Sequence, residues 1–222
     1  MKKIKIGTIG NIFVGKTALC RNYLGEEFST EQMLTVGMEK FVNELEVTIK
    51  EKKIKTQVYI YDTSGQERYE TTVFNFIGKC DGVLLVYAVN SKESFNDISK
   101  WINKIRELQH NKDFPIILIG NKIDLENERV INKEQGDKVA KDYKFDFYET
   151  SAKTGKNVKE AFQHLINLIV KYKEDELLNN IIKKETIPNN NNNGKIDGFE
   201  NEIDKNIINK DKECCSSNCS IF

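Results

Sequence analysis

The sequence predicts an α/β fold in which a mostly parallel sheet carries helices on both faces. Two observations lead to this prediction. Strand-like and helix-like patterns alternate along residues 1–173. The runs 83–89 and 116–119 are also apolar without interruption, which is typical of strands that are covered on both faces. Strands that alternate with helices in this way pair in parallel, because each helix returns the chain to the edge where the strand began.

The individual elements follow from local periodicity. Alternating apolar residues predict strands over 4–9 and 54–61, and a helix opens between them at 17–23. Apolar residues at steps of three and four predict amphipathic helices over 95–108 and 158–172. Their apolar positions are Phe95, Ile98, Ile102, Ile105 and Leu108 in the first, and Val158, Ala161, Phe162, Leu165, Ile169 and Tyr172 in the second.

The composition argues against several classes of protein. The 222 residues are 39% hydrophobic, which is sufficient for a core. Because 34 basic residues balance 34 acidic ones, we expect no nucleic-acid partner, which would require a basic excess. No apolar run approaches the roughly 20 residues of a membrane-spanning helix, and we expect no secretion signal at the N-terminus. Cys20 and Cys80 stand alone and are expected as small buried residues.

The character of the sequence changes near residue 174. We therefore expect a globular domain over 1–173 and a disordered tether over 174–222. The tether contains five consecutive asparagines at 189–193, and its apolar residues form no periodic face. The alternative for its first part is a helix over 174–184 that prolongs the preceding helix.

A phosphate-binding loop is predicted directly after the first strand. Residues 10–17, Gly-Asn-Ile-Phe-Val-Gly-Lys-Thr, match the pattern G-x-x-x-x-G-K-[ST], whose backbone N–H groups surround phosphates. Lys16 would reach the β- and γ-phosphates, and the hydroxyl of Thr17 would bind Mg²⁺. Ile12 and Phe13 are bulky for such a loop, and Phe13 enters left-handed backbone space only at a cost. Alternatively, both side chains point away from the nucleotide and change nothing.

A second phosphate signal follows the next alternating strand. In the sequence Asp-Thr-Ser-Gly-Gln at 62–66, Asp62 is placed to hold Mg²⁺ through water. Gly65 would let a backbone N–H approach a γ-phosphate, and Gln66 would orient an attacking water molecule. Thr35 lies in a loop of low periodicity, so its functional interpretation depends on these other signals.

Two further signals indicate a guanine base. The motif Asn-Lys-Ile-Asp at 121–124 follows the apolar strand that begins at residue 116. The carboxylate of Asp124 would accept two parallel hydrogen bonds from N1–H and the exocyclic amine of guanine, which adenine does not offer. Lys122 would lay its alkyl stem along the base. Backbone N–H groups at 150–153 would meet the guanine O6 atom.

In this order the motifs resemble those of the small GTPases of the Ras superfamily, over residues 3–173. The resemblance implies a P-loop NTPase fold with a six-stranded, mostly parallel sheet, one antiparallel edge strand and helices on both faces. It implies GTP and GDP as ligands, Mg²⁺ as cofactor, and catalytic roles for Gln66 and Lys16. The implied metal ligands are Thr17, Thr35 and, through water, Asp62. The implied nucleotide-binding residues are Gly10, Asn11, Ile12, Phe13, Val14, Gly15, Lys16, Thr17, Ala18, Phe28, Thr35, Gly65, Asn121, Lys122, Asp124, Ser151, Ala152 and Lys153.

The resemblance also implies a molecular switch. Thr35 would bind Mg²⁺ and the γ-phosphate only in the GTP state, and Phe28 would pack on the edge of the guanine. The segments 32–41 and 65–76 would be two switch regions that reorder when the γ-phosphate leaves. Through these regions we expect the chain to meet a nucleotide exchange factor, a GTPase-activating protein and effectors.

Within the superfamily the chain most resembles the Rab branch. The strings Gln-Glu-Arg-Tyr at 66–69 and Glu-Ser-Phe at 93–95, followed by Trp101, are close to Rab segments. Two features depart from the Rab pattern: Tyr61 stands where Rabs usually have Trp, and 36–41 follows the pattern only loosely. A divergent Ras-like signalling GTPase is the alternative. A metabolic phosphoryl transferase is not expected, since such enzymes lack the guanine-reading motifs.

The bulky side chain of Ile12 predicts slow hydrolysis of GTP. Small GTPases usually carry Gly, Ser or Ala at this position, next to the γ-phosphate and to the space that an activator's arginine enters. We therefore expect slow GTP hydrolysis and weak stimulation by arginine-finger activators. Gln66 is intact, which argues against complete loss. The alternative is a constitutively nucleotide-bound, hydrolysis-poor interaction module, in which Ile12 and Phe13 prevent cycling.

The last residues predict a lipid anchor. The chain ends Cys-Ser-Ile-Phe, a C-a-a-X form whose terminal Phe favours geranylgeranylation of Cys219. Because one lipid binds a membrane only marginally, Cys214 and Cys215 are candidates for a second lipid. We therefore expect the chain on the cytoplasmic face of a membrane, with a cytosolic pool and a prenyl-binding escort protein, where it would regulate vesicle traffic.

Overall fold

The computed structural model describes residues 2–29, 35–49, 52–65, 70–109 and 113–185. The chain divides into two compact units, residues 1–181 and 182–222. The first unit contains the sheet and the helices that cover it. In the second unit, residues 182–185 are described, and they form the end of the C-terminal helix α6.

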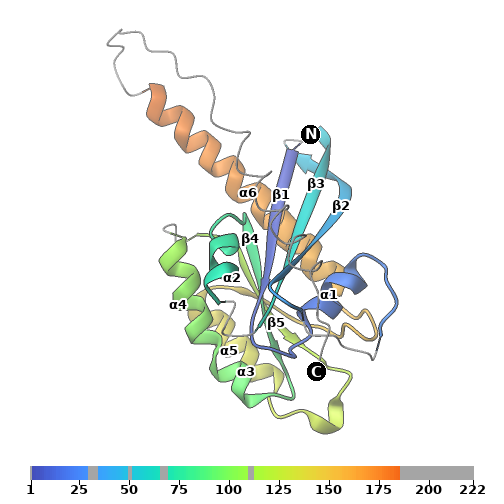
Figure 1. The fold of residues 1–222 in the computed structure, drawn as a ribbon. Coiled ribbons are helices and arrows are strands. Elements are labelled where there is room, and N and C mark those ends of the chain that lie inside the picture. Colours follow the sequence, from blue (N-terminus) through green and yellow to red (C-terminus); the bar gives the residue numbers. More distant parts are fainter. Residues whose placement is uncertain (1, 30–34, 50–51, 66–69, 110–112, 186–222) are drawn as a thin grey trace, which may run out of the picture. The chain divides into compact units, whose positions relative to one another are not determined.

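The described residues form a six-stranded sheet with the strand order β2-β3-β1-β4-β5-β6 (Figure 1). β2 pairs antiparallel with β3 at one edge, and the other neighbouring strands pair in parallel. The strands are β1 (Lys2–Ile9), β2 (Met38–Ile49), β3 (Lys52–Thr63), β4 (Gly82–Ala88), β5 (Ile116–Asn121) and β6 (Asp146–Glu149). The predicted fold class is therefore confirmed, including its single antiparallel edge strand.

The sheet is covered on both faces because its strands direct alternate apolar residues into two cores. In β4, Leu84 and Val86 belong to a core shared with α1 (Lys16–Tyr23) and α6 (Val158–Glu185). Leu85 and Tyr87 belong to the opposite core, shared with α2 (Glu70–Ile77), α4 (Ile98–Leu108) and α5 (Lys133–Tyr143). Cys20 and Cys80 are buried free thiols, one in each core, as predicted.

The helix expected over 95–108 is divided into two. A short helix, α3 (Lys92–Asn96), ends at Asp97, and α4 begins at the next residue. The carboxylate of Asp97 accepts a hydrogen bond of 2.7 Å from Asn11, far away in the sequence. A short 3₁₀ helix, Glu126–Glu128, follows β5. Among the helices of the described residues, none combines the length and apolar character needed to cross a membrane.

α6 extends beyond the predicted end of the globular domain, because it continues to Glu185. Residues 174–185, expected as the start of a disordered tether, are therefore helical, which corresponds to the alternative interpretation. These residues contain strong helix formers and neither Gly nor Pro, and a helix that has already formed is extended at little cost. The remaining residues of the expected tether lie outside the described part of the chain.

The strand order determines where a ligand would bind. β1 lies between β3 and β4, so the connection from β3 through α2 to β4 passes from one side of β1 to the other. Ligands of open α/β sheets bind beyond the carboxyl ends of the strands at such a position. The loops that follow Ile9, Thr63 and Asn121 all begin at this edge.

Candidate nucleotide-binding site

The predicted phosphate loop connects β1 to α1 at this edge of the sheet. Gly15, the N-cap residue of α1, has a φ of 92° and provides no side-chain cap. The first N–H groups of the helix therefore remain available to an anion. Gly10 has a φ of 143°, and a methyl group there would collide with the carbonyl of Val86. Both positions require glycine, which explains the two glycines of the motif.

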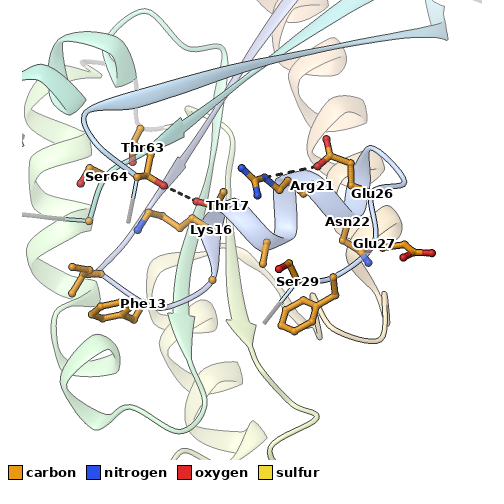
Figure 2. A pocket seen from close by; sticks show the side chains of 16 residues that line it. Phe13, Lys16, Thr17, Arg21, Asn22, Glu26, Glu27, Ser29, Thr63 and Ser64 are labelled. Carbon is orange, nitrogen blue, oxygen red and sulfur yellow. Dashed lines mark hydrogen bonds and ion pairs between the residues drawn. The ribbon is translucent and has the colours of Figure 1, made fainter. Parts of the chain in front are cut away.

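A cavity of about 200 Å³ lies between the phosphate loop, α1 and the end of β3. Figure 2 shows Phe13 and Lys16 toward one end and Asn22, Glu27 and Ser29 toward the other. The predicted residues that line it are Ile12, Phe13, Gly15, Lys16, Thr17, Ala18, Phe28, Thr35 and Gly65.

Other residues that line the cavity were not predicted from the sequence, namely Arg21, Asn22, Glu26, Glu27, Ser29, Thr63 and Ser64. Two of these residues could have been predicted from the helical periodicity of α1. Arg21 and Asn22 lie one turn after Thr17 and Ala18, on the same side of α1. Arg21 is 3.8 Å from a carboxylate oxygen of Glu26 (Figure 2).

Lys16, the residue expected to bind the phosphates, is buried within the phosphate loop. Its side-chain ammonium donates hydrogen bonds of 2.9 Å to the carbonyl of Gly10 and 2.8 Å to that of Asn11. Burial lowers the pKa of Lys16 to about 8, although the nearby carboxylate of Asp62 opposes this shift. A bound phosphate would favour the protonated form again, because an opposite charge stabilises it. The site is therefore arranged to gain from binding an anion.

Three oxygen groups from separate elements meet beside the phosphate loop. The hydroxyl of Thr17 donates a hydrogen bond of 2.6 Å to Asp62 and lies 2.8 Å from the hydroxyl of Thr35. Thr35 in turn lies 3.4 Å from the same carboxylate oxygen. Burial raises the pKa of Asp62, and the hydrogen bond from Thr17 opposes this rise. Hydroxyl and carboxylate oxygens are suitable ligands for Mg²⁺, so the predicted donor set fits the ion.

The first predicted switch segment contacts the residue directly before the second, and the second segment contacts the phosphate loop. The amide of Ser64 donates a hydrogen bond of 2.9 Å to the carbonyl of Gly37. Gly65 lies directly against the backbone of Asn11 and Ile12, where any side chain at position 65 would collide. The expected catalytic Gln66 lies outside the described residues, so its role remains a prediction.

The two bulky residues of the loop line the cavity rather than pointing away from it. Ile12 is 37% exposed and Phe13 is 57% exposed. Phe13 has a φ of 62°, which is left-handed backbone space. This conformation is costly for a residue with a Cβ, and surrounding contacts must therefore hold it.

Asn121 joins the loops on the base side of the site. Its side-chain amide donates a hydrogen bond of 2.9 Å to the carbonyl of Val14 in the phosphate loop. Its oxygen accepts hydrogen bonds of 3.1 Å from the Thr150 hydroxyl and 3.2 Å from the Ala152 amide. Asn121 is buried, so these contacts fix the relative position of three loops. Its side chain is thus a positioning group.

Asp124 is held in place by the neighbouring loop. The hydroxyl of Ser151 donates a hydrogen bond of 2.5 Å to one oxygen of its carboxylate. Lys122 is half-buried with a φ of 70°, and burial lowers its pKa. Asn121, Lys122, Asp124 and Ser151 are not among the residues that line the cavity described above. Asn121 and Lys122 adjoin it at Gly15, where a Cβ would lie 2.5 Å from the Asn121 amide nitrogen and 3.9 Å from the Lys122 side chain.

The fold and these loops together define the class of protein, which is a P-loop GTPase. The model of the Ras family matches residues 5–171, and the chain belongs to this family. Its curated relatives identify it further as a small GTPase of Rab type. It is 38% identical to the Ras-related protein Rab-15 of Rattus norvegicus and of Homo sapiens, over 76% of this chain and 77% of theirs. It is 39% identical to Rab-3C of Bos taurus, over 74% of this chain and 70% of that protein. It is 36% identical to Rab-10 of Caenorhabditis elegans, over 75% of this chain and 80% of that protein.

Membership of this family establishes the general activity. The chain is a guanine-nucleotide switch with GTPase activity, and GTPases of this type bind GTP and GDP, generally with Mg²⁺. The family also implies regulators and effectors as partners.

Proposed function

We propose that the chain regulates vesicle traffic by cycling between GDP-bound and GTP-bound forms. The observation that supports this proposal is the position of Thr35. Its hydroxyl lies 2.8 Å from that of Thr17 and 3.4 Å from a carboxylate oxygen of Asp62, although it belongs to the segment before β2. A ligand that binds all three groups would order this segment, and loss of that ligand would release it.

The described residues supply distinct parts of the proposed reaction. When bound, Mg²⁺ neutralises charge on the β- and γ-phosphates. Thr17 and Thr35 would hold the ion directly, and Asp62 would hold it through water. The ammonium of Lys16 would donate hydrogen bonds to phosphate oxygens and stabilise the negative charge that develops there. Gln66, outside the described residues, would orient the attacking water.

We propose further that hydrolysis is slow. The backbone of Ile12 lies directly against Gly65, so Ile12 stands where the second switch meets the phosphate loop. Ile12 and Phe13 both line the cavity there with exposed apolar side chains. An arginine supplied by an activator would have to be desolvated against these side chains, which is unfavourable for a charge. The two residues therefore also support the alternative of a hydrolysis-poor interaction module.

Single-turnover GTP hydrolysis by the full chain with Mg²⁺, beside Ile12→Gly, tests the proposed rate. Intrinsic hydrolysis by small GTPases is on the order of 10⁻⁴ s⁻¹. We expect a rate below this value that increases in Ile12→Gly. A rate near this value that is unchanged by the substitution would contradict the slow reaction and leave an ordinary switch. Absence of hydrolysis in both proteins, with nucleotide bound, would favour the interaction module.

We propose membrane attachment through geranylgeranylation of Cys219 and a second lipid at Cys214 or Cys215. These cysteines lie outside the described residues, and the support is the C-terminal sequence itself. The proposal places the chain on the cytoplasmic face of a membrane, with an escort protein for its cytosolic pool. Mass spectrometry of the chain from eukaryotic cells tests it, with Cys219→Ser expected to abolish membrane partitioning. Cys20→Ser is the matched control, because that cysteine is buried in the folded domain.

A further inference from the structure

The side chain of Asn11, in the phosphate loop, is held from both ends by residues near the start of α4. Its amide nitrogen donates a hydrogen bond of 2.7 Å to the carboxylate of Asp97. Its amide oxygen accepts a hydrogen bond of 2.6 Å from the indole N–H of Trp101. If the amide were flipped, its nitrogen would face the indole N–H and its oxygen would face the carboxylate, and neither pair can form a hydrogen bond. The two partners therefore permit one orientation of the amide.

The backbone of the same residue faces the proposed phosphate site. The carbonyl of Asn11 accepts a hydrogen bond of 2.8 Å from Lys16. Gly65, at the start of the second switch, packs against this peptide, and a Cβ there would lie 2.6 Å from the Asn11 carbonyl oxygen. Asn11 therefore contacts the phosphate-binding lysine, one end of the second switch and Trp101.

Trp101 also contacts the other end of the second switch. Its ring lies 5.9 Å from the ring of Phe74 on α2, with the two planes at 31°. Trp101 is 7% exposed, so its ring is enclosed in the core between α4 and its neighbours. The predicted switch 65–76 is thus connected to Asn11 at both ends: directly at Gly65, and through Trp101 at Phe74.

We propose that Trp101 couples the nucleotide state of the phosphate loop to the position of α2. This inference rests on the proposed nucleotide cycle. The indole has one donor, and a buried donor that loses its acceptor is costly. When Asn11 moves, the indole ring therefore moves with it to keep the hydrogen bond, and this movement displaces Phe74. The second switch is biased from both of its ends by one residue of the phosphate loop.

The fluorescence of Trp101 tests this coupling directly, because it is the single tryptophan in the chain. Emission is recorded from the full chain with Mg²⁺ and either GDP or the non-hydrolysable analogue GppNHp. We expect the emission to differ between the two nucleotides in the wild type and the difference to disappear in Asn11→Ala. Ile105→Val, a buried substitution on the same helix α4, is the matched control and keeps the difference. An undiminished difference in Asn11→Ala would overturn the proposal.

Hydrogen exchange measures the effect of this coupling on α2. Trp101→Phe keeps an aromatic ring against Phe74 and removes the N–H group. In the wild type we expect amide exchange in α2 to be slower with GppNHp than with GDP. In Trp101→Phe we expect the ratio of the GDP rate to the GppNHp rate to fall by about tenfold, the effect of one hydrogen bond. Exchange in α5 serves as the internal reference. A ratio in α2 that Trp101→Phe leaves intact would contradict the coupling.

The two proposals fail in different ways. A wild-type chain that binds neither GDP nor GppNHp would contradict the proposed function. A wild-type chain that binds both, with identical α2 exchange, would contradict the coupling alone. If Trp101→Phe does not fold, Phe74→Leu interrupts the same connection and leaves the bond between Asn11 and Trp101 in place. Retention of the nucleotide-dependent exchange in Phe74→Leu would then overturn the coupling.

Discussion

The hydroxyl of Thr17 donates a hydrogen bond of 2.6 Å to the carboxylate of Asp62, and this contact joins the start of α1 to the end of β3. The other carboxylate oxygen accepts a hydrogen bond of 3.2 Å from Thr8 in β1. Asp62 is fully buried, with an exposed fraction of 0%. The two threonines thus orient a carboxylate that would otherwise be desolvated without partners.

Thr17→Val removes one of the proposed Mg²⁺ ligands without changing the shape of the side chain. We expect the Mg²⁺ concentration that slows GDP release to rise by more than 100-fold, whereas Thr8→Val, which loosens only the orientation of Asp62, raises it by about tenfold. GDP release is measured by fluorescence at graded Mg²⁺ concentrations. Equal Mg²⁺ dependence in the wild type and Thr17→Val would contradict the proposed metal site.

Phe13→Gly is expected to stabilise the GDP-bound protein. Phe13 has a φ of 62°, and relief of left-handed strain outweighs the entropy cost of glycine by about 0.5–1 kcal/mol. Phe13→Ala is the control, because it also removes the ring but keeps the Cβ that causes the strain. Denaturant unfolding at saturating GDP measures both variants. A Gly variant that is less stable than the Ala variant would show that the backbone at this position is not strained, because only the entropy cost of glycine would then remain.

The pKa of Lys16 predicts a pH dependence of nucleotide binding. Burial lowers it to about 8 in the free protein, and a bound phosphate raises it. Below the pKa of the free protein, Lys16 is protonated in both states. As the pH rises through that value, the free protein loses the proton and the complex keeps it, so binding takes up a proton and the affinity falls.

Isothermal calorimetry in buffers of different ionisation enthalpy measures this proton uptake. For GDP with Mg²⁺, we expect the uptake to be larger at about pH 8.5 than at about pH 7. Lys53→Gln, which removes an exposed lysine of β3, serves as the control and is expected to keep the same profile. The interpretation is wrong if the wild type takes up the same number of protons at both pH values.

Most of the fold could be predicted because short-range patterns specify it. The uninterrupted apolar runs of β4 and β5 and the alternation in β3 identify strands without reference to the rest of the chain. The division between α3 and α4 could not be predicted in this way. The apolar spacing continues across Asp97, whose side chain bonds to Asn11, 86 residues away. The prediction of a disordered tether from residue 174 is wrong for 174–185, which are helical; the sequence there is ambiguous because helix formers and asparagines are mixed after residue 173.

The site shows the same distinction. The residues of the phosphate loop could be predicted because the motif is contiguous and follows a strand. The role of Asn121 could not, because its partners come from two distant parts of the chain: Val14 from the phosphate loop, and Thr150 and Ala152 from the loop after β6. The Cβ of Phe13 predicts a cost for placing this residue in left-handed space. That the backbone takes this conformation is evident only from the structure.

The central claim is that this edge of the sheet binds guanine nucleotides selectively, and relative affinity for GDP and ADP tests it most directly. The measurement uses the full chain with Mg²⁺, beside Asp124→Asn. Because a site built to hydrogen-bond a ligand rejects the analogue that lacks those groups, we predict that GDP binds at least about 10⁴-fold more tightly than ADP. Asp124→Asn is predicted to lose this preference and to bind xanthosine diphosphate better than GDP, since its amide can donate to the xanthine oxygen. Similar affinities of the wild type for GDP and ADP would contradict the account.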